Sequence, residues 1–301
     1  MTWTHEHSWT LAAPPATVFA AFGSADQLTR WFAEHAEIGG RVGEGYRFWG
    51  RHTLGTPSRS EAKQVVTAFE PGQRLGYTWD IRGCPTEVSV ALVAAAQGSR
   101  LTLRHRIDGD LGGPRQKELI DDLWRLSVGN LALHLAGGTD FVLPDFADPA
   151  PEVRLTVILE APCDVVWRAL IEPEALKQWV GSPGLPTVDP RVGGRYEFGW
   201  VYQVDGRTVA GGPTRILEFE PGRKLVVDWP DWRGDATVAP QTLTWVLEPV
   251  GGATRLTLTH GGFARPTDIS DYPFGWREFI SELTKVCLRL DPASPSTPAA
   301  P

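Results

Sequence analysis

The sequence has few of the features that mark secreted or membrane-spanning proteins. Its 301 residues include three cysteines, Cys84, Cys163 and Cys287, an odd and scattered set that predicts no disulfide framework. No run approaches the ~20 consecutive apolar residues that a membrane-spanning helix needs. The first residues also lack the basic and apolar regions of a signal peptide. These absences predict a cytoplasmic protein.

Positive charge is also scarce. The formal net charge is −7, which offers no attractive field for a phosphate backbone or an anionic lipid surface. We therefore expect neither a nucleic-acid partner nor a membrane partner. Hydrophobic residues make up 42% and charged residues 22% of the chain, as in ordinary folded proteins, and the length suits two domains.

Three motifs occur twice in the same order. They are Arg-Val-Gly-x-x-Tyr-x-Phe at 41–48 and 191–198, Phe-Glu-Pro-Gly-x-x-Leu at 69–75 and 219–225, and Arg-Leu-Thr-Leu-x-His at 100–105 and 255–260. Such self-similarity indicates a duplicated domain, so only the loops differ between the copies. We predict a first copy at 1–143, a linker at 144–152, a second copy at 153–291 and a disordered tail at 292–301.

Both copies predict the same sequence of elements. An N-terminal strand, near 3–11 or 153–160, ends at Ala-Pro and precedes two short helices. Several strands separated by Pro-Gly and Gly-Gly turns follow. A long amphipathic helix, near 114–136 or 273–290, closes each copy. The fold class is therefore α+β.

This order of elements and these motifs resemble the START-like helix-grip superfamily, and within it the bacterial branch named after the activator of the heat-shock protein 90 ATPase. The resemblance implies two tandem domains, each a curved antiparallel sheet around a long C-terminal helix with an internal cavity. A sheet that grips one helix cannot close completely. The 13 tryptophans would give such a cavity flat, rigid walls that suit an apolar ligand.

The resemblance implies three alternative functions. The first is binding of a small, largely apolar molecule, aromatic or polyketide-like, by a carrier, sequestering or resistance protein. The second is a polyketide cyclase or aromatase without metal or cofactor, in which His105, His52, Arg47, Tyr77 and Arg104 would steer proton transfers. The third is a co-chaperone that acts by surface contact. The family's co-chaperone has a different kind of N-terminal domain, and nothing in the sequence supports a protein partner.

Histidines and aromatic residues supply most candidates for a ligand site. His105 and His260 share a face with leucines of their strands, so each imidazole either reaches the cavity or ties the strand end structurally. His7 aligns with the apolar Leu155 of the second copy. The complete set of candidate ligand-binding residues is His105, His52, Arg47, Tyr77, Arg104, Trp49, Trp79, Trp124, Ser127, His7 and His260.

The closing helices differ at one position that bears on the cavity. Aligning Trp124 with Trp276 places Ser127 opposite Phe279. Loss of a phenyl ring opens a void or a pocket, unless neighbours such as Trp49 fill the space. We therefore expect the first copy to be the more open one.

Other chemistry finds little support in the motifs. His5-Glu6-His7 puts two imidazoles on one face of a strand, but a third ligand at metal-site spacing is absent. Gly40-Arg-Val-Gly-Glu-Gly leads into a strand and not into a helix, so it predicts a turn and not a phosphate loop. We expect no metal and no cofactor.

Overall fold

The chain divides into two compact units. The computed structural model describes residues 2–204 and 206–291, so the predicted tail at 292–301 lies outside the described residues. The first unit comprises the residues up to Pro149 together with Ala264–Asp271, and the second comprises Ala150–Phe263 and the residues from Tyr272 onward. Within the described residues, no helix is both long and apolar enough to cross a membrane.

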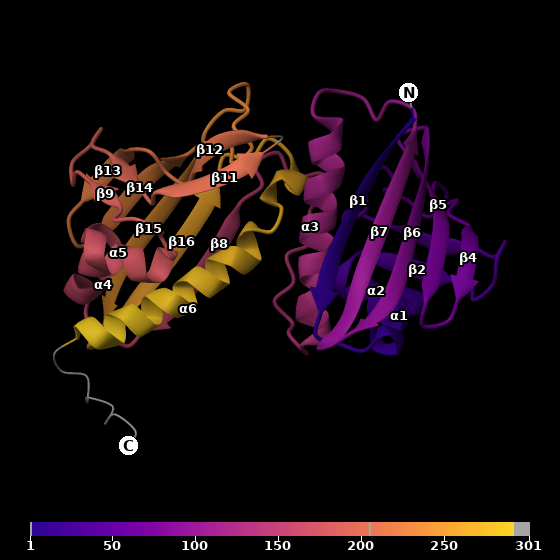
Figure 1. Cartoon of the computed structure of the whole chain (residues 1–301), viewed down its shortest axis with the longest axis horizontal. Helices are drawn as coiled ribbons and strands as arrows, with labels where there is room; N and C mark the ends of the chain where they lie inside the picture. Colours follow the sequence, from indigo (N-terminus) through magenta and orange to yellow (C-terminus); the bar gives the residue numbers. More distant parts are fainter. Residues whose placement is uncertain (1, 205, 292–301) are drawn as a thin grey trace, which may run out of the picture. The chain divides into compact units, whose positions relative to one another are not determined.

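A five-stranded antiparallel sheet forms the body of the first unit, in the order β1-β7-β6-β5-β4 (Figure 1). The edge strand β1 pairs with β7 along its whole length, and the long helix α3 contacts β1, α1 and α2. The elements are β1 (Thr2–Leu11), α1 (Pro15–Gly23), α2 (Ala25–Trp31), β2 (His35–Ile38), β3 (Tyr46–Trp49), β4 (Val66–Glu70), β5 (Arg74–Ile81), β6 (Cys84–Ala95), β7 (Gly98–Asp108) and α3 (Gln116–Leu135).

The second unit repeats this topology, with its sheet in the order β13-β14-β15-β16-β8. Its elements are β8 (Val153–Leu159), α4 (Cys163–Ile171), α5 (Pro173–Val180), β9 (Thr187–Val188), β10 (Tyr196–Glu197), β11 (Trp200–Val204), β12 (Arg207–Gly211), β13 (Ile216–Glu220), β14 (Lys224–Trp229), β15 (Gln241–Val250), β16 (Ala253–Gly261) and α6 (Tyr272–Leu290); a short 3-10 turn, η1 (Pro266–Ile269), belongs to the first unit. The β11–β12 hairpin is an addition, because residues 50–64 of the first unit form only turns and coil. Both units are helix-grip domains, as predicted.

The repeated motifs have repeated structural roles. The motif tyrosines are buried and donate their hydroxyls to the helix before them, Tyr46 to the Phe22 carbonyl at 2.9 Å and Tyr196 to the Leu170 carbonyl at 2.7 Å. A β-bulge recurs at the equivalent place in β4 and β13. Because these contacts lie between elements that are distant in the sequence, they fix the strands relative to the short helices in both units.

The segment after α3 lies on the first unit. The buried side chain of Asn130 donates to the Val142 carbonyl at 2.8 Å and accepts from the Val142 amide at 3.0 Å. The Phe146 amide donates to the Arg51 carbonyl at 3.0 Å, and Phe141 and Phe146 pack partly buried against the core. Residues 141–146 therefore form a docked strap on this unit.

Candidate functional site

A buried hydrogen-bonded relay joins α3 to the sheet through His105. The Trp124 indole N–H donates to His105 Nδ1 at 3.1 Å, and His105 Nε2 lies 2.8 Å from the Thr86 hydroxyl. Because an indole N–H only donates, Nδ1 must accept, and the imidazole proton lies on Nε2. The Thr86 hydroxyl in turn donates to the Trp79 carbonyl. The groups that this relay links are hydrogen-bonded within the protein, whereas the indole N–H of Trp79 is buried without a hydrogen-bond partner.

The second unit contains the same relay around His260. The Trp276 indole N–H donates to His260 Nδ1 at 3.1 Å, and His260 Nε2 donates to Gln241 Oε1 at 3.0 Å. Neither His105 nor His260 has solvent-exposed surface. Burial lowers the pKa of each to about 3, so both imidazoles are neutral near pH 7. In this state they clamp helix to sheet, and their contact with a ligand stays a prediction.

Three further candidates gather around His105. Trp79 lies parallel to the imidazole, with centroids 5.7 Å apart, and edge-on to Trp124 at 6.3 Å. Tyr77 stacks on Tyr46 at 4.5 Å, and burial raises the pKa of Tyr77. These rings form a closed aromatic interior.

The remaining candidates lie apart from that interior. Arg104 forms an ion pair with Glu6 at 2.8 Å and lines a polar cleft of about 420 Å³; the Arg47 guanidinium lies 3.7 Å from Glu37. His52 Nδ1 lies 3.0 Å from the Pro144 carbonyl of the strap. Half-buried Trp49 stacks on His35, and half-buried His7 lies against Trp9. The structure therefore does not bring these side chains into one site with His105.

Phe32 packs on Trp124, which lies on the same face of α3 as Ser127. The Phe32 ring lies against Trp31 at 5.4 Å and against Trp124 at 5.8 Å. Ser127 is buried and donates its hydroxyl to the Leu123 carbonyl at 2.7 Å. A phenyl ring thus lies beside this face of α3 in the first unit as well, and an open space beside Ser127 stays a prediction.

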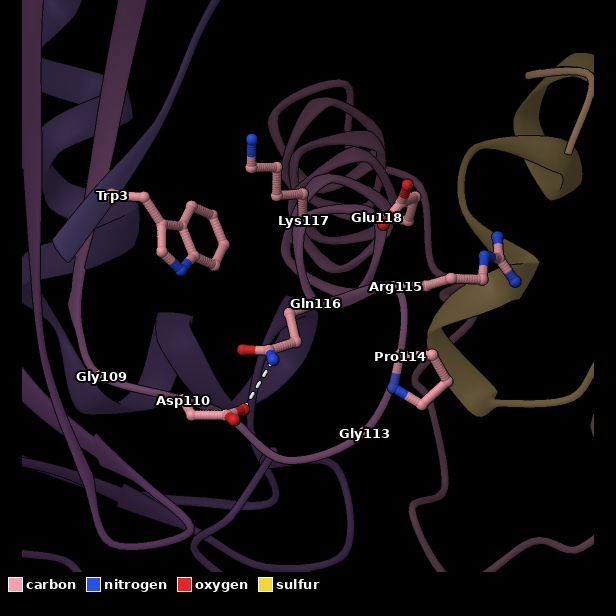
Figure 2. A pocket seen from close by; sticks show the side chains of 9 residues that line it. All are labelled: Trp3, Gly109, Asp110, Gly113, Pro114, Arg115, Gln116, Lys117 and Glu118. Atoms are coloured by element: carbon pink, nitrogen blue, oxygen red, sulfur yellow. Dashed lines mark hydrogen bonds between the residues drawn. The ribbon is translucent and has the colours of Figure 1, made fainter. Parts of the chain in front are cut away.

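A cleft of about 620 Å³ opens in the first unit beside the start of α3 (Figure 2). One wall is the half-buried indole of Trp3 on β1, and the other comes from the β7–α3 loop and the first turn of α3. The lining residues are Trp3, Gly109, Asp110, Gly113, Pro114, Arg115, Gln116, Lys117 and Glu118.

Gln116 fixes the loop that forms the floor of this cleft. Its Nε2 donates to Asp110 Oδ1 at 2.6 Å, and its Oε1 accepts from the Leu111 amide at 2.8 Å. The same Asp110 oxygen accepts from the Gly112 amide at 2.8 Å. Gly112 and Gly113 have φ of 79° and 85°, which glycine adopts without strain. The cleft is thus held by specific contacts on its loop side.

The motifs of the sequence did not predict this cleft. Trp3, Gln116 and Lys117 were not among the candidates, because no motif surrounds them. The usable signal was the alternation of β1, which puts Trp3, His5, His7 and Trp9 half-buried on one face. Among the described residues, Nε2 of His5 is buried without a hydrogen-bond partner, and burial is the main cause that lowers the pKa of His5 and of His7.

In the part of the chain that the structure describes, no three His, Cys, Asp or Glu side chains lie together so that they could hold a metal ion. The cleft offers instead an aromatic wall, a fixed loop and charged side chains at its rim. Such a site can bind and orient a small molecule.

The fold and its duplicated core define a tandem helix-grip protein. The model of the family described as "Activator of Hsp90 ATPase homolog 1-like protein" matches residues 12–136 and again residues 160–287. Since these segments span well over half of the chain, the protein belongs to this family, in two tandem copies. A comparison with curated proteins found no match.

Several solved structures resemble the chain. DynU16, a putative protein in the dynemicin biosynthetic locus, is 20% identical, with 94% of this chain and 98% of that chain covered and a TM-score of 0.39. CV1439 from Chromobacterium violaceum is 26% identical over 45% of this chain and 96% of its own, with a TM-score of 0.35. The Aha1 dimer from Colwellia psychrerythraea is 18% identical over 46% and 96%, with a TM-score of 0.36. All three scores lie below 0.5, so no functional conclusion rests on them.

Proposed function

We propose that the first unit binds a small, largely apolar molecule with a flat ring, as a carrier, sequestering or resistance protein. The observation that carries this proposal is the cleft of about 620 Å³ beside Trp3. Its volume lies within the range of roughly 300–1,000 Å³ typical of small-molecule sites. The indole offers a rigid apolar face against which a ring can stack.

The cleft is a better candidate than the interior around His105. The aromatic rings there pack against one another, and both nitrogens of His105 are already hydrogen-bonded. A cyclase would need an acid or base that exchanges protons near neutral pH. His105, with a pKa of about 3 and no exposed surface, does not suit that task. Binding without chemistry is therefore the function that we favour.

Titration with a neutral aromatic probe tests the proposal. N-phenyl-1-naphthylamine should bind the full-length protein saturably, and Trp3→Ala should weaken binding about 10-fold, since loss of a ring contact costs about 1.4 kcal/mol. Trp3→Phe should retain most of the affinity. Trp9→Ala is the matched control, because Trp9 is half-buried on the same face of β1 but does not line the cleft.

Equal affinities for the wild type, Trp3→Ala and Trp9→Ala would reject the cleft as the binding site. Thermal unfolding of each variant shows whether the fold is retained.

A further inference from the structure

The charged residues of the cleft are not equivalent. In Figure 2, Lys117 extends from α3 on the side of Trp3, whereas Arg115 and Glu118 extend on the opposite side. The fourth charged residue, Asp110, accepts hydrogen bonds from Gln116 and Gly112 at the floor. Lys117 is therefore the positive charge on the side of Trp3, and Asp110 is the negative charge at the floor.

The ammonium group of Lys117 is available to a ligand. The side chain is exposed, and within residues 2–204 and 206–291 it forms no ion pair. The first turn of α3 adds a positive potential of the same sign, because the N-terminal end of a helix carries a partial positive charge. The rim of the cleft on the side of Trp3 thus favours an anion.

The second copy lacks both parts of this arrangement. With the strands aligned as His7 to Leu155, Pro151 stands at the position of Trp3. With the helices aligned as Trp124 to Trp276, α6 begins at the residue aligned with Ile120, so no helical residue of the second copy stands at the position of Lys117. The combination of an aromatic wall and a neighbouring cation therefore occurs in the first copy alone of the two. The fold that both copies share does not depend on it.

We infer that the cleft selects a flat-ringed molecule bearing an acidic group, such as a carboxylate, with the ring against Trp3 and the anion beside Lys117. This inference rests on the proposed function and adds the charge of the ligand. A cation at the rim discriminates through charge, whereas the indole contributes ring contact to charged and neutral ligands alike. The two contributions can therefore be measured separately.

Two probes with the same ring system separate them. 8-Anilinonaphthalene-1-sulfonate carries an anion, and N-phenyl-1-naphthylamine is its neutral counterpart. At low salt the wild-type protein should bind the sulfonate about 5-fold more tightly than the amine, as expected for one partly exposed charge pair. Lys117→Met should abolish this preference and leave the affinity for the amine unchanged, whereas Lys117→Arg should keep it. Raising the salt concentration should weaken sulfonate binding alone.

Lys63→Met is the control, because it removes an exposed lysine of the same unit that does not line the cleft. It should preserve the preference for the sulfonate. If Lys117→Met retains the wild-type preference, or if both lysine variants lose it equally, the inference is wrong. If the amine binds through Trp3 but the sulfonate is not preferred, the proposed function stands and the inference that the ligand carries an acidic group is wrong. If neither probe depends on Trp3, both proposals fail.

Discussion

Phe32 lies against Trp124 with ring centroids 5.8 Å apart and ring planes 7° apart. In the second unit, Phe279 lies 5.7 Å from Trp276 with ring planes 56° apart, and it stacks on Trp200 at 5.3 Å. The residue aligned with Phe32 is Val180. One copy therefore supplies the phenyl ring from the end of its second short helix, and the other supplies it from its long helix.

This exchange predicts a compensating pair of substitutions. Ser127→Phe alone should destabilise the first unit by about 1–3 kcal/mol, because the Phe32 ring already packs beside this face of α3. Phe32→Val alone should cost about 2–4 kcal/mol through the cavity that it leaves. The double variant should recover at least 1 kcal/mol relative to the sum of the two. Denaturant unfolding of the four proteins measures the coupling, and strict additivity would show that the two rings do not share one space.

The histidine relays predict a pH-dependent stability. His105 and His260 have a pKa of about 3 when folded, against 6.5 as the ordinary value. Between these values the unfolded chain binds the extra proton, so stability falls as the pH falls below about 6.5. In this pH range, each buried histidine should lower the free energy of unfolding of its unit by about 1.4 kcal/mol for every pH unit of acidification. Burial also lowers the pKa values of His5, His7 and His134, which adds to the slope in the first unit.

Replacement of one histidine separates the relays. His105→Gln should reduce the slope for the first unit between pH 6.5 and 5 by about 1.4 kcal/mol per pH unit and leave the second unit unchanged. The measurement is urea unfolding at pH 7, 6 and 5, with amide hydrogen exchange used to report the stability of each unit separately. A slope for the first unit that is the same with and without His105 would contradict a buried neutral imidazole.

The strap gives a third prediction. Asn130→Leu removes both hydrogen bonds to Val142 and should destabilise the docked segment by about 1–3 kcal/mol. Proteolysis within residues 141–149 should then become faster, and the amide of Phe146 should exchange sooner. Asn130→Asp keeps the acceptor for the Val142 amide but places a buried carboxylate against the Val142 carbonyl, so it should loosen the strap at least as much as Asn130→Leu near pH 7, and less at a pH low enough to protonate the carboxyl group. Equal protection in all three proteins would mean that Asn130 does not hold the strap.

Much of the fold could be predicted because the same motifs occur in the same order in both halves of the sequence. Agreement between 41–48 and 191–198 or between 100–105 and 255–260 required no knowledge of contacts. The roles of the repeated residues were harder to predict. Trp124 and His105 are 19 residues apart, and nothing in the local pattern shows that the indole N–H donates to the imidazole.

The site was largely beyond sequence reasoning. Phe32 stands at the end of a short helix, and only its packing on Trp124 reveals that the first copy also has a phenyl ring beside its long helix. The cleft joins Trp3 to Lys117 across more than a hundred residues, and neither belongs to a repeated motif. The residues that make each copy different, such as Trp3 and Lys117, lie at positions that the copies do not share. A search for repeated motifs therefore does not find them.

The most direct test of the account is an NMR titration of the indole N–H signals with 8-anilinonaphthalene-1-sulfonate. We expect saturable shifts for the Trp3 indole and for the backbone amides of Gly113 and Lys117, which line the cleft. The indole signals of Trp79 and Trp124, which lie in the closed interior, should stay in place. Shifts centred on Trp79 and Trp124, with Trp3 unchanged, would contradict binding at the cleft and place the ligand beside His105.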